Sequence, residues 1–189
     1  MFESNTEKWA ECMFGKAELG DKRRTKRLVT FAADMANGIG KSIVKAGRNA
    51  ASIEGAYRFV ENQHIDHNEI ALAGFKATAE EVKRRRLVLA IEDTTSLSYR
   101  HSIGSELGNN PSSASATCKG RSLFLHFILV VDADDETVVG LGHQQNYIRK
   151  EKLKLTGLEL AQRSKEEKES YRWEESSNKL ESILEIQIM

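Results

Sequence analysis

Cysteine, proline and long apolar runs are all scarce in this 189-residue sequence, and each scarcity narrows the class of protein. Its two cysteines, Cys12 and Cys118, lie far apart, so neither a disulfide framework nor a zinc knuckle is indicated. No apolar run approaches the roughly 20 residues of a membrane span, and the N-terminus lacks a basic-then-apolar signal segment. These absences predict a cytoplasmic protein with no membrane partner.

Net charge is absent too, because 28 basic and 28 acidic side chains cancel. The net charge therefore gives no sign of a nucleic-acid partner, but the charged residues are unevenly distributed along the sequence. Residues 22–27 and 83–86 are basic clusters, whereas residues 132–136 are acidic. We expect local fields of this kind to attract phosphate. A length of 189 residues with 40% hydrophobic side chains allows one domain or two small ones.

The first part of the chain is predicted to be entirely helical. Apolar residues recur at helical spacing over 6–19, 21–37, 49–61 and 66–84. Asp21 can cap the second of these helices, and Asp66 the fourth. Residues 41–45 are expected to be an extended or irregular link. In the third helix, the residues expected to be buried are Ile53, Ala56, Tyr57 and Val60.

Three cations share one flank at the start of the second helix. Arg23 and Arg27 lie one turn apart, with Lys26 beside them. They are suited to DNA phosphates or base edges, although a solvated charged face is the commoner explanation of such a run. Cations in a first turn oppose the helix dipole, which is a weak sign that another role retains them.

Residues 87–91 predict a buried strand that carries Asp93 at its exposed end. A carboxylate at the end of a strand can hold Mg²⁺ in a cleft, but Glu92 and Asp93 can equally just end the strand before a turn. Spacing alone favours the second interpretation. The Ser-, Gly- and Asn-rich residues 104–120, which contain the only proline, predict a surface loop.

The rest of the chain predicts an antiparallel hairpin and a charged helix. Strands are expected over 122–132 and 137–147, and a helix over 166–186. His126 and His143 lie among apolar neighbours, where a hydrogen-bonded core histidine is commoner than a metal ligand. The glutamates of the helix alternate with basic residues, which is typical of a solvated, ion-paired surface. The resulting fold class is α/β, with a helical module before strands and a helix.

Five stretches together resemble bacterial cut-and-paste transposases of the transposon-5 type, within the insertion-sequence-4 family. They are LGDKRRTKRL (19–28), GKSI (40–43), EGAYRF (54–59), LAIEDTTSLSYRH (89–101) and VGLGHQ (139–144). The resemblance implies a helical domain that binds double-stranded transposon-end DNA over residues 1–65. It implies the first part of a ribonuclease-H-like catalytic domain over 66–189.

The resemblance also implies roles for single residues. Asp93 corresponds by position to the first metal-binding carboxylate of a DDE triad. This match is the reason why we prefer the metal-binding interpretation of Asp93 to the strand-end interpretation. The DNA-binding positions implied by the match, together with the basic flank, are Arg23, Arg24, Lys26, Arg27, Lys41, Glu54 and Arg58.

The family's reaction is DNA strand cleavage and transfer with Mg²⁺ or Mn²⁺ held by three carboxylates. The family's second aspartate and its glutamate lie in later segments that have no counterpart before Met189. We therefore expect a truncated ribonuclease-H-like domain that is inactive alone and does not hold the metal tightly. The alternative function is a regulatory inhibitor that forms mixed complexes with full-length transposase.

Overall fold

The computed structural model describes residues 5–98, 107–109, 121–149 and 162–184, and divides into two compact units. The first unit comprises Met1–Leu89 and Val130–Gly140, and the second comprises Ala90–Leu129 and Leu141–Met189. Most of the predicted loop over 104–120 lies outside the described residues. In the described part, no helix is both long and apolar enough to cross a membrane.

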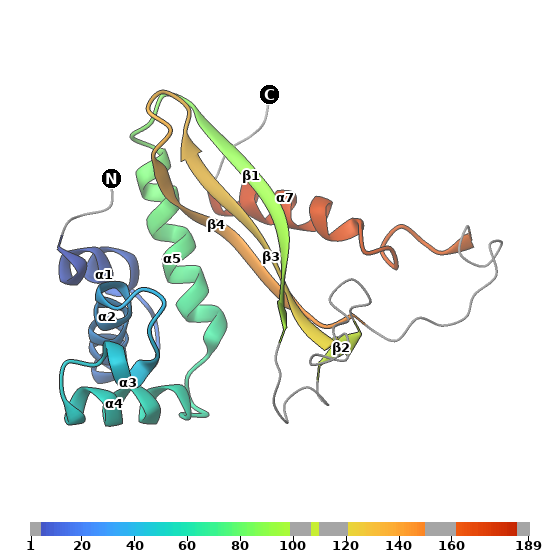
Figure 1. The fold of residues 1–189 in the computed structure, drawn as a ribbon. Helices are drawn as coiled ribbons and strands as arrows, with labels where there is room; N and C mark the ends of the chain where they lie inside the picture. The colour runs from blue at the N-terminus through green and yellow to red at the C-terminus, as the bar shows by residue number, and fades with distance from the viewer. Residues whose placement is uncertain (1–4, 99–106, 110–120, 150–161, 185–189) are drawn as a thin grey trace. The chain divides into compact units, whose positions relative to one another are not determined.

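Five helices precede the first strand, which confirms the all-helical prediction for this part (Figure 1). Their bounds are α1 (Thr6–Phe14), α2 (Lys22–Asn37), α3 (Ile43–Ala46), α4 (Ala50–Val60) and α5 (His67–Val82). The predicted link over 41–45 is wrong in part, because Ile43–Ala46 form a helical turn. Helix α1 is shorter than predicted because it ends at Gly15, and Gly20 lies in a later turn with φ of 74°.

Side-chain acceptors begin the helices as the sequence predicts. The carboxylate of Asp21 accepts from the backbone N–H of Arg23, and that of Asp66 accepts from Asn68. Asn49 and Ser52 form a reciprocal capping box at the start of α4. Each cap satisfies backbone donors that the first helical turn leaves without an intrahelical partner.

The buried face of α4 differs from the predicted one. Ala56 is buried as expected, but Tyr57 and Val60 are 43% and 50% exposed, whereas Phe59 is only 8% exposed. Phe59 packs with Phe31 of α2 at 6.2 Å between ring centroids. Helical spacing does not distinguish these two neighbouring faces, because both carry apolar residues, so the choice depends on where α2 lies.

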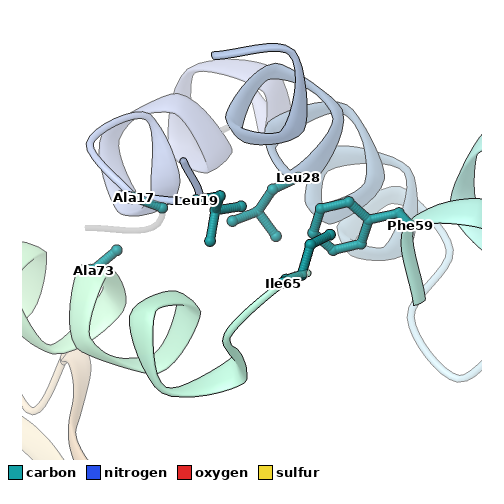
Figure 2. Packing of buried hydrophobic residues seen from close by; sticks show 6 residues of the cluster. All are labelled: Ala17, Leu19, Leu28, Phe59, Ile65 and Ala73. Atoms are coloured by element: carbon teal, nitrogen blue, oxygen red, sulfur yellow. The ribbon is translucent and has the colours of Figure 1, made fainter. Parts of the chain in front are cut away.

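One apolar cluster holds the helices of the first unit together (Figure 2). Leu28 of α2 and Phe59 of α4 meet Ile65 from the link before α5, and Ala73 comes from α5 itself. Ala17 and Leu19, which follow α1, complete the cluster. Because side chains from α2, α4 and α5 share this core, the geometry of α2 against α4 is fixed by burial rather than by local sequence.

Within the described residues, four strands form one sheet around β3, with the hairpin that the sequence predicts (Figure 1). The strands are β1 (Val88–Ser98), β2 (Gly108–Asn109), β3 (Arg121–Asp132) and β4 (Val138–Tyr147). Strand β3 pairs with each of the others. Strands β1 and β3 run in opposite directions, because Leu87 contacts Ala133 at one end and Ser98 contacts Ser122 at the other. The fold is therefore mixed α/β.

Strand β1 corrects the prediction of a buried strand that ends at Asp93. The strand continues to Ser98, so Asp93 lies in its middle. Leu89, Ile91 and Leu97 are 51%, 48% and 40% exposed. They point to the same side as Asp93, since side chains alternate along a strand. In the described residues nothing buries this side, and the apolar run is half-exposed for that reason.

On the other side of β1, within the second unit, three polar side chains form a buried hydrogen-bond network. His126 of β3 is fully buried, and its two ring nitrogens lie 2.6 Å from the Thr94 hydroxyl and 2.8 Å from the Glu92 carboxylate. The interpretation of His126 as a hydrogen-bonded core residue is confirmed. Helix α7 (Tyr171–Leu184), which begins later than predicted, buries Leu180 and Leu184 but leaves Trp173 44% exposed.

Candidate nucleic-acid interface

Helices α2 and α4 enclose a hollow of about 390 Å³ in the first unit. Four arginines and one glutamate contribute to its wall. The lining residues are Arg23, Arg24, Arg27, Ala51, Glu54, Gly55, Arg58, Phe59 and Asn62. Five of the predicted DNA-binding residues therefore share one surface, although they come from two helices, α2 and α4, with α3 between them in the sequence.

Gly55 allows the close approach of the two helices. A Cβ atom at this position would lie 2.6 Å from Cζ of Arg27. The Arg27 guanidinium therefore lies against the α4 backbone, in space that any other residue would occupy. Within the described residues Arg27 makes no hydrogen bond or ion pair, so its donors are available to a ligand.

Two of the other arginines have a carboxylate beside them. Arg58 donates to Glu54 one turn earlier, at 2.6 Å, and Arg23 donates to Asp21 at 3.0 Å. The side chains of Arg58 and Arg23 are 77% and 92% exposed, so water screens both pairs and each is worth little to stability. Both arginines can exchange these partners for phosphate oxygens at small cost.

Arg24 has a structural role as well as a place in the wall. Its Nη1 atom donates to the carbonyl oxygen of Leu19 at 3.0 Å and to that of His64 at 3.2 Å. These bonds join the start of α2 to the segment before α5. Removal of Arg24 would therefore change the shape of the hollow in addition to its charge.

Lys26 and Lys41 do not line the hollow, although the sequence groups them with the other cations. Lys26 is exposed on α2, and Lys41 is exposed in the turn that follows Gly40. The backbone N–H of Lys41 donates to Gly38 at 2.8 Å, so the turn itself is defined. These two residues are solvated cations outside the hollow.

The second basic cluster, residues 83–86, is neutralised within the first unit. Arg85 pairs with Asp132 at 2.9 Å, and Arg86 pairs with Asp134. The other two members pair with the glutamates Glu80 and Glu81 of α5. Each member of the cluster thus has a carboxylate partner, and Arg85 is the least exposed of the four at 22%. The attraction of the cluster for phosphate stays a prediction.

Asp93 lies in the second unit, exposed in the middle of β1. Its neighbours in sequence, Glu92 and Thr94, point to the opposite side of β1, where they bind His126. Among the described residues, no group of three acidic, histidine or cysteine side chains could hold a metal ion. A lone exposed carboxylate does not fit a site for two divalent ions, so the metal role of Asp93 stays a prediction.

Sequence reasoning missed the neutral residues of the wall. Gly55 and Ala51 are small residues on α4, and Asn62 follows its end. Their contribution depends on how α2 crosses α4, which no local pattern reveals. The EGAYRF stretch did mark the position of Gly55, but not its contact with Arg27.

A comparison with protein families places this hollow in a known context. Residues 6–65 match the family model described as "Transposase DNA-binding". The matched range begins with α1 and ends after α4, so it contains every residue that lines the hollow. The N-terminal part of the chain is thus supported as a transposase DNA-binding region.

Proposed function

We propose that this chain binds double-stranded transposon-end DNA through the hollow between α2 and α4, as the N-terminal part of a transposase of the transposon-5 type. The observation that carries the proposal is the convergence of four arginines on one hollow inside the matched range. We further propose that residues 66–189 are the first part of a ribonuclease-H-like domain. The three-stranded antiparallel arrangement of β4, β3 and β1 is compatible with such a domain.

The residues of the hollow suit two kinds of DNA contact. Arg23 and Arg58 are the most exposed cations and are assigned to phosphate oxygens. Arg27 is held against α4 and can present its planar guanidinium to a base edge. Glu54, once Arg58 turns to a phosphate, can accept from a cytosine amino group. Lys26 and Lys41 would add contacts outside the hollow.

A binding assay at several salt concentrations tests the proposal. Two phosphate contacts from Arg23 and Arg58, or four if Lys26 and Lys41 contribute, predict that log K falls with log[salt] with a slope of about −2 to −4. Arg27→Ala should weaken binding to the transposon end by about tenfold, because a charge-assisted hydrogen bond to DNA is lost. Lys76→Ala on α5, which removes the same charge away from the hollow, is the matched control and should leave binding unchanged.

The same preparations test the catalytic expectation. A two-metal reaction needs carboxylates around both ions, and the described residues contain no group of three acidic, histidine or cysteine side chains that could hold a metal ion. We therefore expect no nicking of end DNA on addition of Mg²⁺ or Mn²⁺. Equal affinity of the parent chain for scrambled DNA would contradict end recognition, and Mg²⁺-dependent nicking would contradict the expected inactivity.

Two further expectations remain proposals of the same kind. Mixed complexes with a full-length transposase would make the chain a regulatory inhibitor, and co-purification of the two proteins would test this. A cytoplasmic location agrees with a DNA-binding role.

A further inference from the structure

The second unit contains its own hollow, which no part of the proposed function uses. It measures about 480 Å³ and lies where β1, β3 and β4 meet the start of α7. Its wall combines three aromatic side chains, two arginines, three serine or threonine residues and one glutamate. The lining residues are Thr94, Ser96, Phe124, Tyr147, Arg149, Glu169, Ser170, Arg172 and Trp173.

Four of these side chains form a continuous stack. Arg149 lies over the ring of Phe124 at 4.1 Å, and the rings of Phe124 and Tyr147 are stacked with 5.3 Å between centroids. Arg172 lies over the other ring of the stack, that of Tyr147, at 3.9 Å. Planar guanidinium groups therefore lie at both ends of an aromatic pair. Both rings of the pair are therefore covered, and Trp173 is the remaining aromatic ring of the wall on which a nucleobase could stack.

Glu169 fixes one end of the stack. Its carboxylate accepts from the Tyr147 hydroxyl at 2.7 Å and from Nε of Arg149 at 2.8 Å. The pKa of the Tyr147 hydroxyl is raised to about 12 by burial and by this hydrogen bond, so the phenol stays a donor. The charge of Arg149 is thus compensated by Glu169 inside the protein. We therefore assign Arg149 to the structure of the wall and not to the binding of a ligand.

Arg172 at the other end has no such partner. In the described residues it makes no ion pair, and its Nε atom is buried without a hydrogen-bond partner. Hydroxyl groups of Ser96 and Ser170 line the same hollow, and Ser170 directly precedes α7, whose N-terminal end favours negative charge. The charge of Arg172 acts on Glu169 and Glu175 without an ion pair to either, and a guanidinium among hydroxyls is a suitable environment for a phosphate group.

We propose that this hollow binds a nucleotide, with its phosphate on Arg172 and the Ser96 and Ser170 hydroxyls and its base against Trp173. Trp173 lines the hollow and is 44% exposed, while the edge contact with His126 fixes its orientation. The volume lies in the range of about 300–1,000 Å³ that is usual for small-ligand sites. None of these residues lies within 6–65, so the inference goes beyond the proposed function and does not rest on it.

Trp173 provides a direct readout. The chain has two tryptophans, so a Trp9→Phe background leaves Trp173 as the sole reporter. We expect 2′-deoxyadenosine 5′-monophosphate to change its emission saturably, with a Kd on the order of 0.1–1 mM. Deoxyadenosine and inorganic phosphate should each bind at least about tenfold more weakly, because each offers only one of the two contacts.

Arg172→Gln is the principal variant, because glutamine keeps a planar polar group near Tyr147 but removes the charge. It should weaken nucleotide binding by about tenfold or more. Lys168→Ala removes one positive charge just before the same helix, outside the hollow, and should leave the affinity unchanged. If Arg172→Gln does not fold, Ser96→Asp tests the same site, since a carboxylate in the hollow repels phosphate.

The ligand can be a free nucleotide or a nucleotide within a DNA strand, and a short oligodeoxyadenylate separates the two. Much tighter binding of the oligonucleotide supports a strand, whereas equal affinities support a free nucleotide. Absence of any saturable change, or unchanged affinity in a folded Arg172→Gln or Ser96→Asp variant, overturns the proposal. Binding of duplex end DNA by Arg172→Gln, measured in parallel, shows whether the region over 6–65 is intact.

Discussion

Gly55 shows how one residue without a side chain can determine a binding surface. Arg27 lies in the space above it, and a Cβ would come within 2.6 Å of the guanidinium carbon. That carbon is the far end of a flexible side chain, so Arg27 can move aside without disturbing the backbone. Gly55 therefore matters more for the position of Arg27 in the hollow than for the stability of the fold.

Gly55→Ala should consequently separate DNA affinity from stability. Alanine is the better helix former by about 1 kcal/mol, so the free energy of unfolding should not fall, while displacement of Arg27 should weaken DNA binding about fivefold or more. Gly74→Ala on α5 is the matched control, because its Cβ would make an ordinary contact, 3.5 Å from Phe14. Thermal melting and binding isotherms check both; unchanged DNA affinity in Gly55→Ala would contradict the role given to Arg27.

Single residues also show the limit of sequence reasoning. Arg23, Arg27 and Arg58 could be chosen as candidate DNA contacts because charge and the family resemblance are local properties of the sequence. The ion pairs of Arg85 and Arg86 could not be predicted in this way, since their partners Asp132 and Asp134 are 47 and 48 residues away. Whether a cation is free for a ligand depends on what folding brings beside it.

At the scale of elements, caps and turns were predictable because their physics is local. Asp21 and Asp66 begin α2 and α5, and the turn after β3 joins the expected hairpin. The buried side of α4 and the exposure of β1 were not predictable, because each depends on what another segment covers. An apolar run such as 87–91 indicates a strand but not whether both of its faces are buried.

The cap of α2 makes stability depend on pH. Hydrogen bonds from the side chain and backbone of Arg23 hold the pKa of the Asp21 carboxyl below its ordinary value of 3.8. A carboxyl whose pKa is lowered by folding stabilises the folded state above its unfolded pKa, and this contribution is lost as the pH falls through the lower, folded value. Asp21 therefore contributes to stability at neutral pH and loses this contribution in acid, below about pH 3.8.

Asp21→Asn tests this argument, because asparagine is also a good N-cap but does not titrate. The melting temperature of the variant should fall less steeply than that of the parent between neutral pH and pH 3. Asp66→Asn, the same change at the cap of α5, is the matched comparison, since Asp66 has no arginine at its side chain among the described contacts. Identical acid profiles for the parent and Asp21→Asn would contradict the assignment.

At the scale of the whole molecule, the first unit is built from two separate stretches of the chain, Met1–Leu89 and Val130–Gly140. Arg85 and Asp132 join these stretches at 2.9 Å, with side chains only 22% and 7% exposed. Asp132 also accepts from the backbone N–H of Asp134 at 2.8 Å. The sequence predicted both stretches as elements, but not that they form one unit.

The pair therefore predicts a coupling that a double-mutant cycle can measure in the full chain. Asp132→Asn keeps the shape but leaves the Arg85 guanidinium partly buried without its counter-charge, which should lower the free energy of unfolding by about 2–4 kcal/mol. Arg85→Gln should lower the free energy of unfolding less in the Asp132→Asn variant than in the parent chain, with a coupling energy of about 1–3 kcal/mol. Urea unfolding, followed by Trp9 emission in a Trp173→Phe background, reports on this unit, because Trp9 lies in α1. Strictly additive effects would mean that the two stretches are joined by apolar packing alone.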